Sequence, residues 1–157
     1  MKRPIITFYG VSMAALSRRL QEMVDALPLR PGLRVIEVGC GPGTAAREIA
    51  RRVSPTGHVL AIDRSATAIE QLTKSAPDLI SAGWLSARQV AIEELQLHER
   101  EDRYDIALAV RVGALDGRHP HLKLLALQRL GQALVPGGRL FIDGGSPLRE
   151  VIVPTVE

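Results

Sequence analysis

The sequence predicts an α/β fold with a doubly wound, mostly parallel sheet that carries helices on both faces. Short apolar runs rich in β-branched residues alternate along the chain with segments whose apolar residues recur at helical spacing. The continuous apolar run at residues 105–110 is typical of a strand buried on both faces. A glycine-rich stretch, residues 39–43, joins the first strand-like run to a helix.

Length and composition fit one domain over residues 1–157 with a single core. The chain has 157 residues, of which 46% are hydrophobic and 24% charged, close to average globular values. Residues 12–27 have apolar side chains at helical spacing up to Pro28, which predicts a helical N-terminal segment within residues 1–30. The sheet and its helices are then expected within residues 31–157.

The helices and strands of this core are predicted from short apolar runs and from the turn residues that separate them. Turn residues separate the elements, as at residues 54–57 and 135–138, and Ser65 is a favourable helix N-cap. The expected strands are residues 33–38, 58–62, 88–92, 105–110 and 139–143. The expected helices are residues 44–53, 66–74 and 120–133, with residues 76–87 completing a helical layer.

The composition argues against several classes of protein. The formal net charge is only +3, and aromatic residues, 3% of the chain, are too few for a base-stacking surface, so no nucleic-acid partner is expected. No apolar run approaches the roughly 20 residues of a membrane span. Residues 1–11 do not read as a secretory signal, so a cytoplasmic protein without membrane contact is expected. Cys40 is the only cysteine, which excludes an internal disulfide, and no metal site is expected.

Candidate functional residues follow the carboxyl ends of the predicted strands, where ligands bind in sheets of this kind. The stretch after the first strand begins with Glu37 and has glycine at alternate positions of residues 39–43. Glycines there let the backbone turn sharply and approach a ligand closely, and the free amides suit a polar or anionic group. Asp63 ends the second strand about 20 residues further on and can accept both hydroxyls of a ribose. Residues 109–111, at the end of the fourth strand, are the third candidate.

The glycine spacing departs from the dinucleotide fingerprint G-x-G-x-x-G, because Thr44 stands in the place of its last glycine. The stretch from Glu37 instead reads acidic-x-Gly-x-Gly-x-Gly, and it resembles the first motif of the class I S-adenosylmethionine-dependent methyltransferases. Residues 58–63, 104–108 and 134–140 are similar, in the same order, to the second strand, the fourth strand and the turn into the fifth strand of that family. The resemblance implies a Rossmann-like nucleotide-binding core and S-adenosylmethionine as cofactor.

The resemblance implies cofactor-binding roles in the loop after the first strand. Glu37 would orient the ammonium group at the methionine end of the cofactor, directly or through water. Gly39 and Gly41 would present backbone to the amino-acid and ribose portions, with Cys40 and Gly43 completing the loop. Cys40 itself is interpreted as a small loop residue and not as a nucleophile, because no basic residue is adjacent to it in sequence.

The resemblance also implies roles at the ends of the other strands. Asp63 would hold the ribose hydroxyls, and Arg64 would flank the adenine. The aspartate that relatives often carry after the third strand is missing, so a backbone amide near Ile92 or the carboxylate of Glu93 is expected to contact the adenine. Backbone at the end of the fourth strand would close over the methionine end. The cofactor-binding residues expected outside the glycine loop are Asp63, Arg64, Ile92, Glu93, Val110 and Arg111.

The leading hypothesis is an S-adenosylmethionine-dependent methyltransferase that acts on a small-molecule acceptor. Alignment of the reactants would be the main contribution of the protein, so no general base is required and no catalytic residue is assigned. His119 and His121 are interpreted as solvated residues at a helix start, and residues 1–20 and 111–121 are expected to form the acceptor wall. Two alternatives remain open: a non-catalytic member of the fold that acts as a binding or partner subunit, and a nicotinamide-dependent oxidoreductase.

The C-terminal part of the sequence predicts an abbreviated sheet. Residues 144–157 follow the fifth strand, and residues 151–153 are enough for one short strand. We therefore expect residues 140–142 to expose apolar side chains at an open sheet edge. A homodimer formed through residues 139–157 or through the helix at residues 12–27 would cover them.

Overall fold

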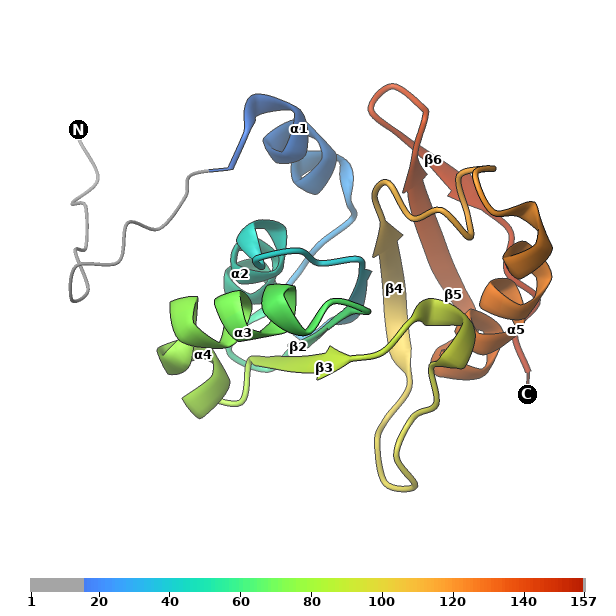
Figure 1. Ribbon diagram of the computed structural model, residues 1–157. Helices are drawn as coiled ribbons and strands as arrows, with labels where there is room; N and C mark the ends of the chain where they lie inside the picture. Colours follow the sequence, from blue (N-terminus) through green and yellow to red (C-terminus); the bar gives the residue numbers. More distant parts are fainter. Residues whose placement is uncertain (1–15, 157) are drawn as a thin grey trace.

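The computed structural model describes residues 16–156 and confirms the expected α/β architecture (Figure 1). Its six-stranded sheet has the order β3-β2-β1-β4-β5-β6, and neighbouring strands are parallel except β5 and β6, which are antiparallel. The strands are β1 (Arg34–Val38), β2 (His58–Asp63), β3 (Leu85–Gln89), β4 (Tyr104–Ala109), β5 (Leu134–Asp143) and β6 (Leu148–Val151). The helices are α1 (Arg18–Ala26), α2 (Thr44–Val53), α3 (Ala66–Ser75), α4 (Pro77–Ser81) and α5 (Lys123–Ala133), with short 3₁₀ helices η1 (Ile92–Glu94) and η2 (Pro120–Leu122).

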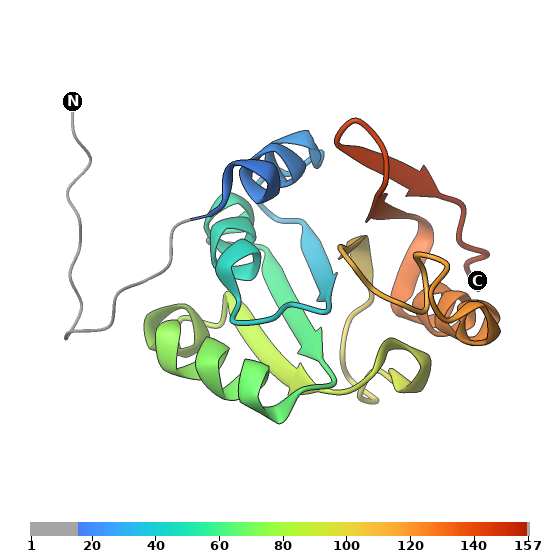
Figure 2. The same ribbon diagram turned by 45° about the horizontal axis from the view of Figure 1, so that its top comes forward.

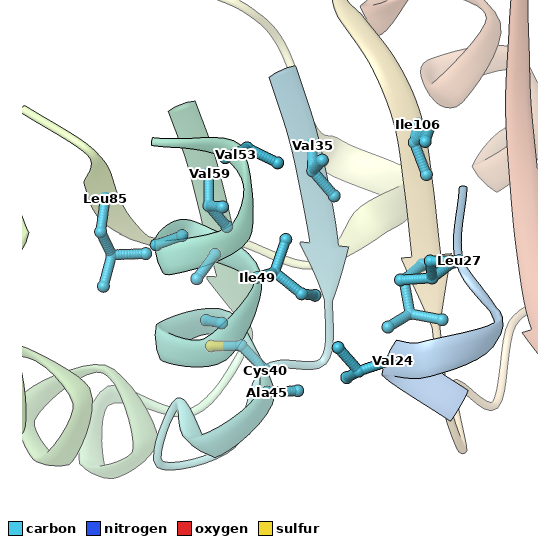
Figure 3. Packing of buried hydrophobic residues seen from close by; sticks show 14 of the residues in the cluster. Val24, Leu27, Val35, Cys40, Ala45, Ile49, Val53, Val59, Leu85 and Ile106 are labelled. Atoms are coloured by element: carbon cyan, nitrogen blue, oxygen red, sulfur yellow. The ribbon is translucent and has the colours of Figure 1, made fainter. Parts of the chain in front are cut away.

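Helices cover both faces of the sheet (Figure 2). Val35 of β1 and Val59 of β2 belong to the core cluster under α1, α2 and α3, which also contains Ile49 of α2 (Figure 3). The next residue in each strand, Ile36 and Leu60, belongs to a second cluster under α5 and η1. All five side chains are fully buried. The strands are therefore buried on both sides, as their continuous apolar sequences predict.

The third strand and the helical layer before it differ from the prediction. β3 begins at Leu85 instead of residue 88, and the helical layer ends with α4 at Ser81 instead of residue 87. β3 contains no β-branched residue, and its strand conformation comes from parallel pairing with β2. Ile92, whose branched side chain favours a strand, instead begins η1. Pairing with a neighbour thus overrides local propensity at this sheet edge.

The C-terminal edge of the sheet also differs. A single short strand is present as predicted, but it lies at residues 148–151 instead of 151–153 and pairs antiparallel with β5. Because β6 covers the edge of β5, residues 140–142 are at most 8% exposed. The expectation that these residues expose apolar side chains at an open edge is wrong. The homodimer stays a prediction, but an open sheet edge no longer supports it.

The N-terminal helix of the described chain begins at Arg18. Ser17 caps it, since its Oγ accepts the Leu20 N–H at 3.2 Å, and the helix ends before Pro28 as predicted. Residues 1–15 lie outside the described residues, and with them the start of the helix predicted at residues 12–27 and most of the N-terminal acceptor wall. Within residues 16–156, no helix combines the length and the apolar character that crossing a membrane requires.

The strand order creates a crevice between β1 and β4. The chain leaves β1 through α2 toward β2 and β3 on one side, and it leaves β4 through α5 toward β5 on the other. Val38 and Ala109, which end the two strands, are neighbours in register. Connections that diverge in this way leave room for a ligand outside the carboxyl ends of the strands.

Candidate functional site

The loop between β1 and α2 presents open backbone at this carboxyl edge. Gly39, Gly41 and Gly43 have φ angles of 68°, 53° and 88°, a region that residues with a Cβ rarely adopt. A Cβ at Gly41 would meet no atom within 4 Å, whereas a Cβ at Gly43 would lie 1.9 Å from Leu72 Cδ1. Gly43 is therefore required by the packing of α3 against the loop, and Gly41 leaves free space beside the backbone.

Asp63, the last residue of β2, holds the glycine loop in place. Its Oδ2 accepts the Gly41 N–H at 3.0 Å, and its Oδ1 accepts the Ser65 N–H at 2.8 Å. Each carboxylate oxygen has a second lone pair that a ligand hydroxyl can use. Asp63 can therefore orient the loop and accept hydroxyl groups at the same time.

Glu37 is a buried acid with one unsatisfied oxygen. The residue is 7% exposed, and within residues 16–156 nothing hydrogen-bonds to its buried Oε2. Burial raises the pKa of Glu37 to about 8, the negative charge of Asp63 adds to this, and Arg47 opposes it. A cationic group beside Oε2 would satisfy this oxygen and favour the ionised form. The ammonium group of S-adenosylmethionine fits that requirement.

A cavity of about 440 Å³ opens along the carboxyl ends of β1, β2, β3 and β4. This volume lies in the usual range of small-molecule sites. The lining includes these sequence-predicted residues: Gly39, Asp63, Arg64, Ile92, Glu93, Val110 and Arg111. The other predicted residues, which are outside the lining, are Glu37, Cys40, Gly41 and Gly43. In the part of the chain that the structure describes, no group of three or more His, Cys, Asp or Glu residues could hold a metal ion.

The Cys40 side chain faces the protein interior. It belongs to the same core cluster as Ala45, Ile49 and Val59 (Figure 3). Burial raises the pKa of the Cys40 thiol, which keeps it protonated and unreactive. Its side chain therefore fills the core, and only its backbone is available to a ligand at the loop. This agrees with its interpretation as a small loop residue.

The cavity wall extends beyond the residues to which the sequence assigns a cofactor role. The lining also includes Val90, Val112, Gly113, Ala114, Arg118, His119 and Leu122. Most of these belong to the segment after β4, which the sequence assigns to an acceptor wall. The strand order predicts that these residues line the site, because the segment after β4 leaves the sheet next to the glycine loop, where the connections diverge.

The segment after β4 is anchored to β5 through Asp143. Arg111 has a φ of 56°, and it is the only non-glycine residue of the described chain with a positive φ. Its N–H donates to Asp143 Oδ1 at 3.1 Å, and Arg19 Nη2 of α1 lies 3.9 Å from Asp143 Oδ2. Strained backbone of this kind persists where its surroundings hold it and is concentrated at functional sites. α1, β5 and the segment after β4 thus meet at one carboxylate beside the cavity.

Sequence comparisons find a matching family and several relatives. Residues 29–154 match the family described as a methyltransferase domain. A protein-L-isoaspartate O-methyltransferase from Methanothrix thermoacetophila is 29% identical over 153 residues, which cover 98% of this chain and 66% of that protein. An uncharacterized 37.1 kDa protein in transposon TN4556 of Streptomyces fradiae is 35% identical over 119 residues, which cover 75% of this chain and 32% of that protein.

A structural comparison shows the same fold. A SAM-dependent methyltransferase from Aquifex aeolicus is similar with a TM-score of 0.63 at 18% identity, over 78% of this chain and 62% of that one. The chain spans less than two thirds of the length of each of these three relatives. The family match at residues 29–154 contains all six strands, the glycine loop and the cavity lining. The chain belongs to the methyltransferase domain family, with the Rossmann-like fold of the class I S-adenosylmethionine-dependent enzymes.

Proposed function

We propose that the protein is an S-adenosylmethionine-dependent methyltransferase that acts on a small-molecule acceptor. The observation that carries this proposal is a pair of acids at the glycine loop. Glu37 has a buried oxygen without a partner among the described residues, and Asp63, which lines the cavity, accepts the Gly41 N–H. The first acid suits a cationic group and the second a ribose. The cofactor would supply a methyl group already activated on its sulfonium, which leaves sulfur as its bond to the acceptor forms.

The residues of this chain would bind and align the reactants. Asp63 would accept the ribose hydroxyls through the lone pairs that Gly41 and Ser65 leave free. Glu37 would balance positive charge at the methionine end, and Arg64 would border the adenine. Alignment of two reactants in a cavity of this kind can lower a barrier by about 7–11 kcal/mol. No residue is needed to activate the cofactor.

A second cavity supports a small acceptor. It has a volume of about 760 Å³ and lies between α1 and the turn at residues 144–147. Arg19 lines this second cavity and Arg111 lines the first, and both contact Asp143. Because both arginines contact Asp143, we infer that an acceptor in the second cavity would approach the cofactor from this side. Relatives are named for different acceptors, among them protein, ribosomal RNA and nocamycin, so the acceptor class is the finer part of this proposal.

Titration calorimetry with S-adenosylmethionine, S-adenosylhomocysteine and NAD tests the cofactor class. We expect both S-adenosyl compounds to bind and to raise the melting temperature, and NAD to do neither. Asp63→Ala should weaken S-adenosylhomocysteine binding about 10- to 100-fold, because the ribose hydroxyls lose a charged acceptor. Asp102→Ala is the matched control, since Asp102 is exposed and precedes β4 at the opposite edge of the sheet. It should bind like the wild type.

The acceptor class is tested with S-adenosylmethionine that carries a radiolabelled methyl group. Separate panels of small amines, alcohols and carboxylates are compared with total RNA and with a protein extract. Label in a small molecule is the expected result, and label confined to RNA or protein would refute the small acceptor. Binding of NAD in place of the S-adenosyl compounds would instead indicate an oxidoreductase. S-adenosyl binding without transfer to any panel would indicate a non-catalytic subunit.

A further inference from the structure

His119 occupies a part of the cavity wall that a glycine makes available. It lies between β4 and η2 and lines the 440 Å³ cavity together with Gly113 and Leu122. A Cβ at Gly113 would lie 2.4 Å from His119 Cδ2 and 3.1 Å from His119 Nε2. The imidazole therefore rests directly against the Gly113 backbone, in a position that a larger residue would deny it.

Hydrogen bonds within the segment hold the backbone around His119. The His119 N–H donates to Gly113 O at 2.9 Å, so a hydrogen bond closes the loop between Gly113 and the histidine whose ring packs against it. Arg118 Nη2 donates to Arg111 O at 2.6 Å, and the Arg111 N–H is bound to Asp143 of β5. The position of the ring is thus set by a loop that is tied both to itself and to the sheet.

The ring nitrogens of His119 have unused hydrogen-bonding capacity. Neither Nδ1 nor Nε2 has a hydrogen-bond partner among the described residues, and the ring contact is with His121, at 6.1 Å between centroids. A neutral imidazole carries one donor and one acceptor. The edge of adenine likewise presents an amino donor beside ring-nitrogen acceptors. Ala91 and Ile92, on the cavity wall after β3, have no side-chain group that could make such bonds.

The helix that follows His119 through η2, α5, packs against η1, whose residues line the same cavity. Arg129 Nε of α5 donates to the Glu93 carbonyl of η1 at 3.3 Å. Ile92 and Glu93 line the same cavity as His119. These are the residues beside which the adenine is expected, so His119 lines the cavity in which the nucleoside would bind.

We propose that His119 binds the purine-nucleoside half of the cofactor and that Gly113 makes room for its ring. This inference rests on the proposed function, because it takes S-adenosyl compounds as the ligands of the cavity. His119 is exposed directly before η2, as its sequence context predicts, and the proposal adds a binding role to that position.

The experiment compares two probes that share the nucleoside. Calorimetry measures the affinities of S-adenosylhomocysteine and of 5′-methylthioadenosine, which lacks the amino-acid half, for the wild type, His119→Ala and His98→Ala. We expect His119→Ala to weaken both probes by the same factor, about three- to tenfold, the usual effect of one lost hydrogen bond. His98→Ala is the matched control, since His98 is exposed and outside the cavity lining, and it should change neither affinity.

The outcomes separate this inference from the function on which it rests. If the wild type does not bind S-adenosylhomocysteine, the proposed function fails. If the wild type binds and His119→Ala binds equally well, only the role of His119 is refuted. If His119→Ala weakens S-adenosylhomocysteine but not 5′-methylthioadenosine, His119 contacts the amino-acid half and the assignment to the nucleoside is wrong.

Gly113→Ala provides a second, independent variant. Gly113 does not have a positive φ, so alanine fits its backbone, and the new Cβ displaces only the flexible ring of His119. We expect Gly113→Ala to weaken both probes to a similar extent as His119→Ala. In the His119→Ala background the same change should have no further effect, because the ring that it displaces is already gone. Additive losses in the double variant would overturn the role assigned to Gly113.

Discussion

Replacing Glu37 by glutamine should remove a loss of stability that the wild type suffers as the pH rises from 4.5 to about 8. In the folded protein, burial and then the charge of Asp63 raise the pKa of Glu37 from 4.5 to about 8. Between these values the folded state keeps its proton while the unfolded chain releases it, so the free energy of unfolding falls with rising pH. Below pH 4.5 both states are protonated and above pH 8 both are ionised, so the loss is confined to this window.

The expected magnitude follows from the width of that window. While the two states differ by one proton, each pH unit lowers the free energy of unfolding by about 1.4 kcal/mol. From pH 4.5 to about 8 the loss is therefore on the order of 4 kcal/mol. This is a large share of the roughly 5–15 kcal/mol by which domains are stable. Glutamine is close to glutamate in size but cannot ionise, so the Glu37→Gln variant escapes the loss.

Urea unfolding at pH 5, 6, 7 and 8, followed by circular dichroism, measures the effect. Burial lowers the pKa of His58, which makes stability rise with pH over part of the same range. The diagnostic quantity is therefore the difference between variant and wild type. It should grow in favour of Glu37→Gln by about 3–4 kcal/mol from pH 5 to pH 8. Glu70→Gln, at an exposed position of α3, should follow the wild type, and a pH-independent difference for Glu37→Gln would refute the reasoning.

Three further predictions concern the glycine loop and assembly. Gly41→Val should fold but lose S-adenosylhomocysteine binding in calorimetry, because a Cβ there meets no protein atom within 4 Å and would crowd a cofactor bound against the loop backbone. Gly83→Val, at another open glycine with a φ of 79°, should still bind S-adenosylhomocysteine. Equal binding by both variants would mean that the glycine loop is only a turn and does not contact the cofactor. Gly43→Ala should lower the free energy of unfolding by about 2–4 kcal/mol in urea, because its Cβ overlaps Leu72; unchanged stability would contradict the packing role. Light scattering should give about twice the monomer mass of 17.0 kDa if the predicted homodimer forms, and the monomer mass would rule it out.

The order of helices and strands followed from local patterning, with one informative exception. β1 and β4 are central strands, and their continuous apolar runs reflect burial on both faces. β3 is an edge strand whose residues after Leu85 are only partly buried or exposed, so no run of apolar residues marks it. Its bounds are set by backbone pairing with β2, a long-range interaction that leaves no trace in composition.

Part of the site could also be predicted from the sequence alone. The glycines at residues 39–43 and the acid at Asp63 have roles that depend on residue type and spacing, because only glycine opens the backbone and a carboxylate at a strand end accepts hydroxyls. Four motifs in order, from Glu37 to residues 134–140, were enough to indicate the family that the comparisons confirm. The turn predicted at residues 135–138 is wrong, because β5 begins at Leu134 instead of residue 139.

Other properties arise only when distant segments are brought together in space. Glu37 owes its raised pKa to burial and to Asp63 on the neighbouring strand, and Gly43 owes its necessity to Leu72 of α3. His119 reaches the cavity because Gly113 leaves room for its ring and α5 packs on η1. Spacing along the chain determines which groups are available, whereas burial, charge and close contact depend on neighbours in three dimensions. Those neighbours set the protonation of the acid and the position of the ring.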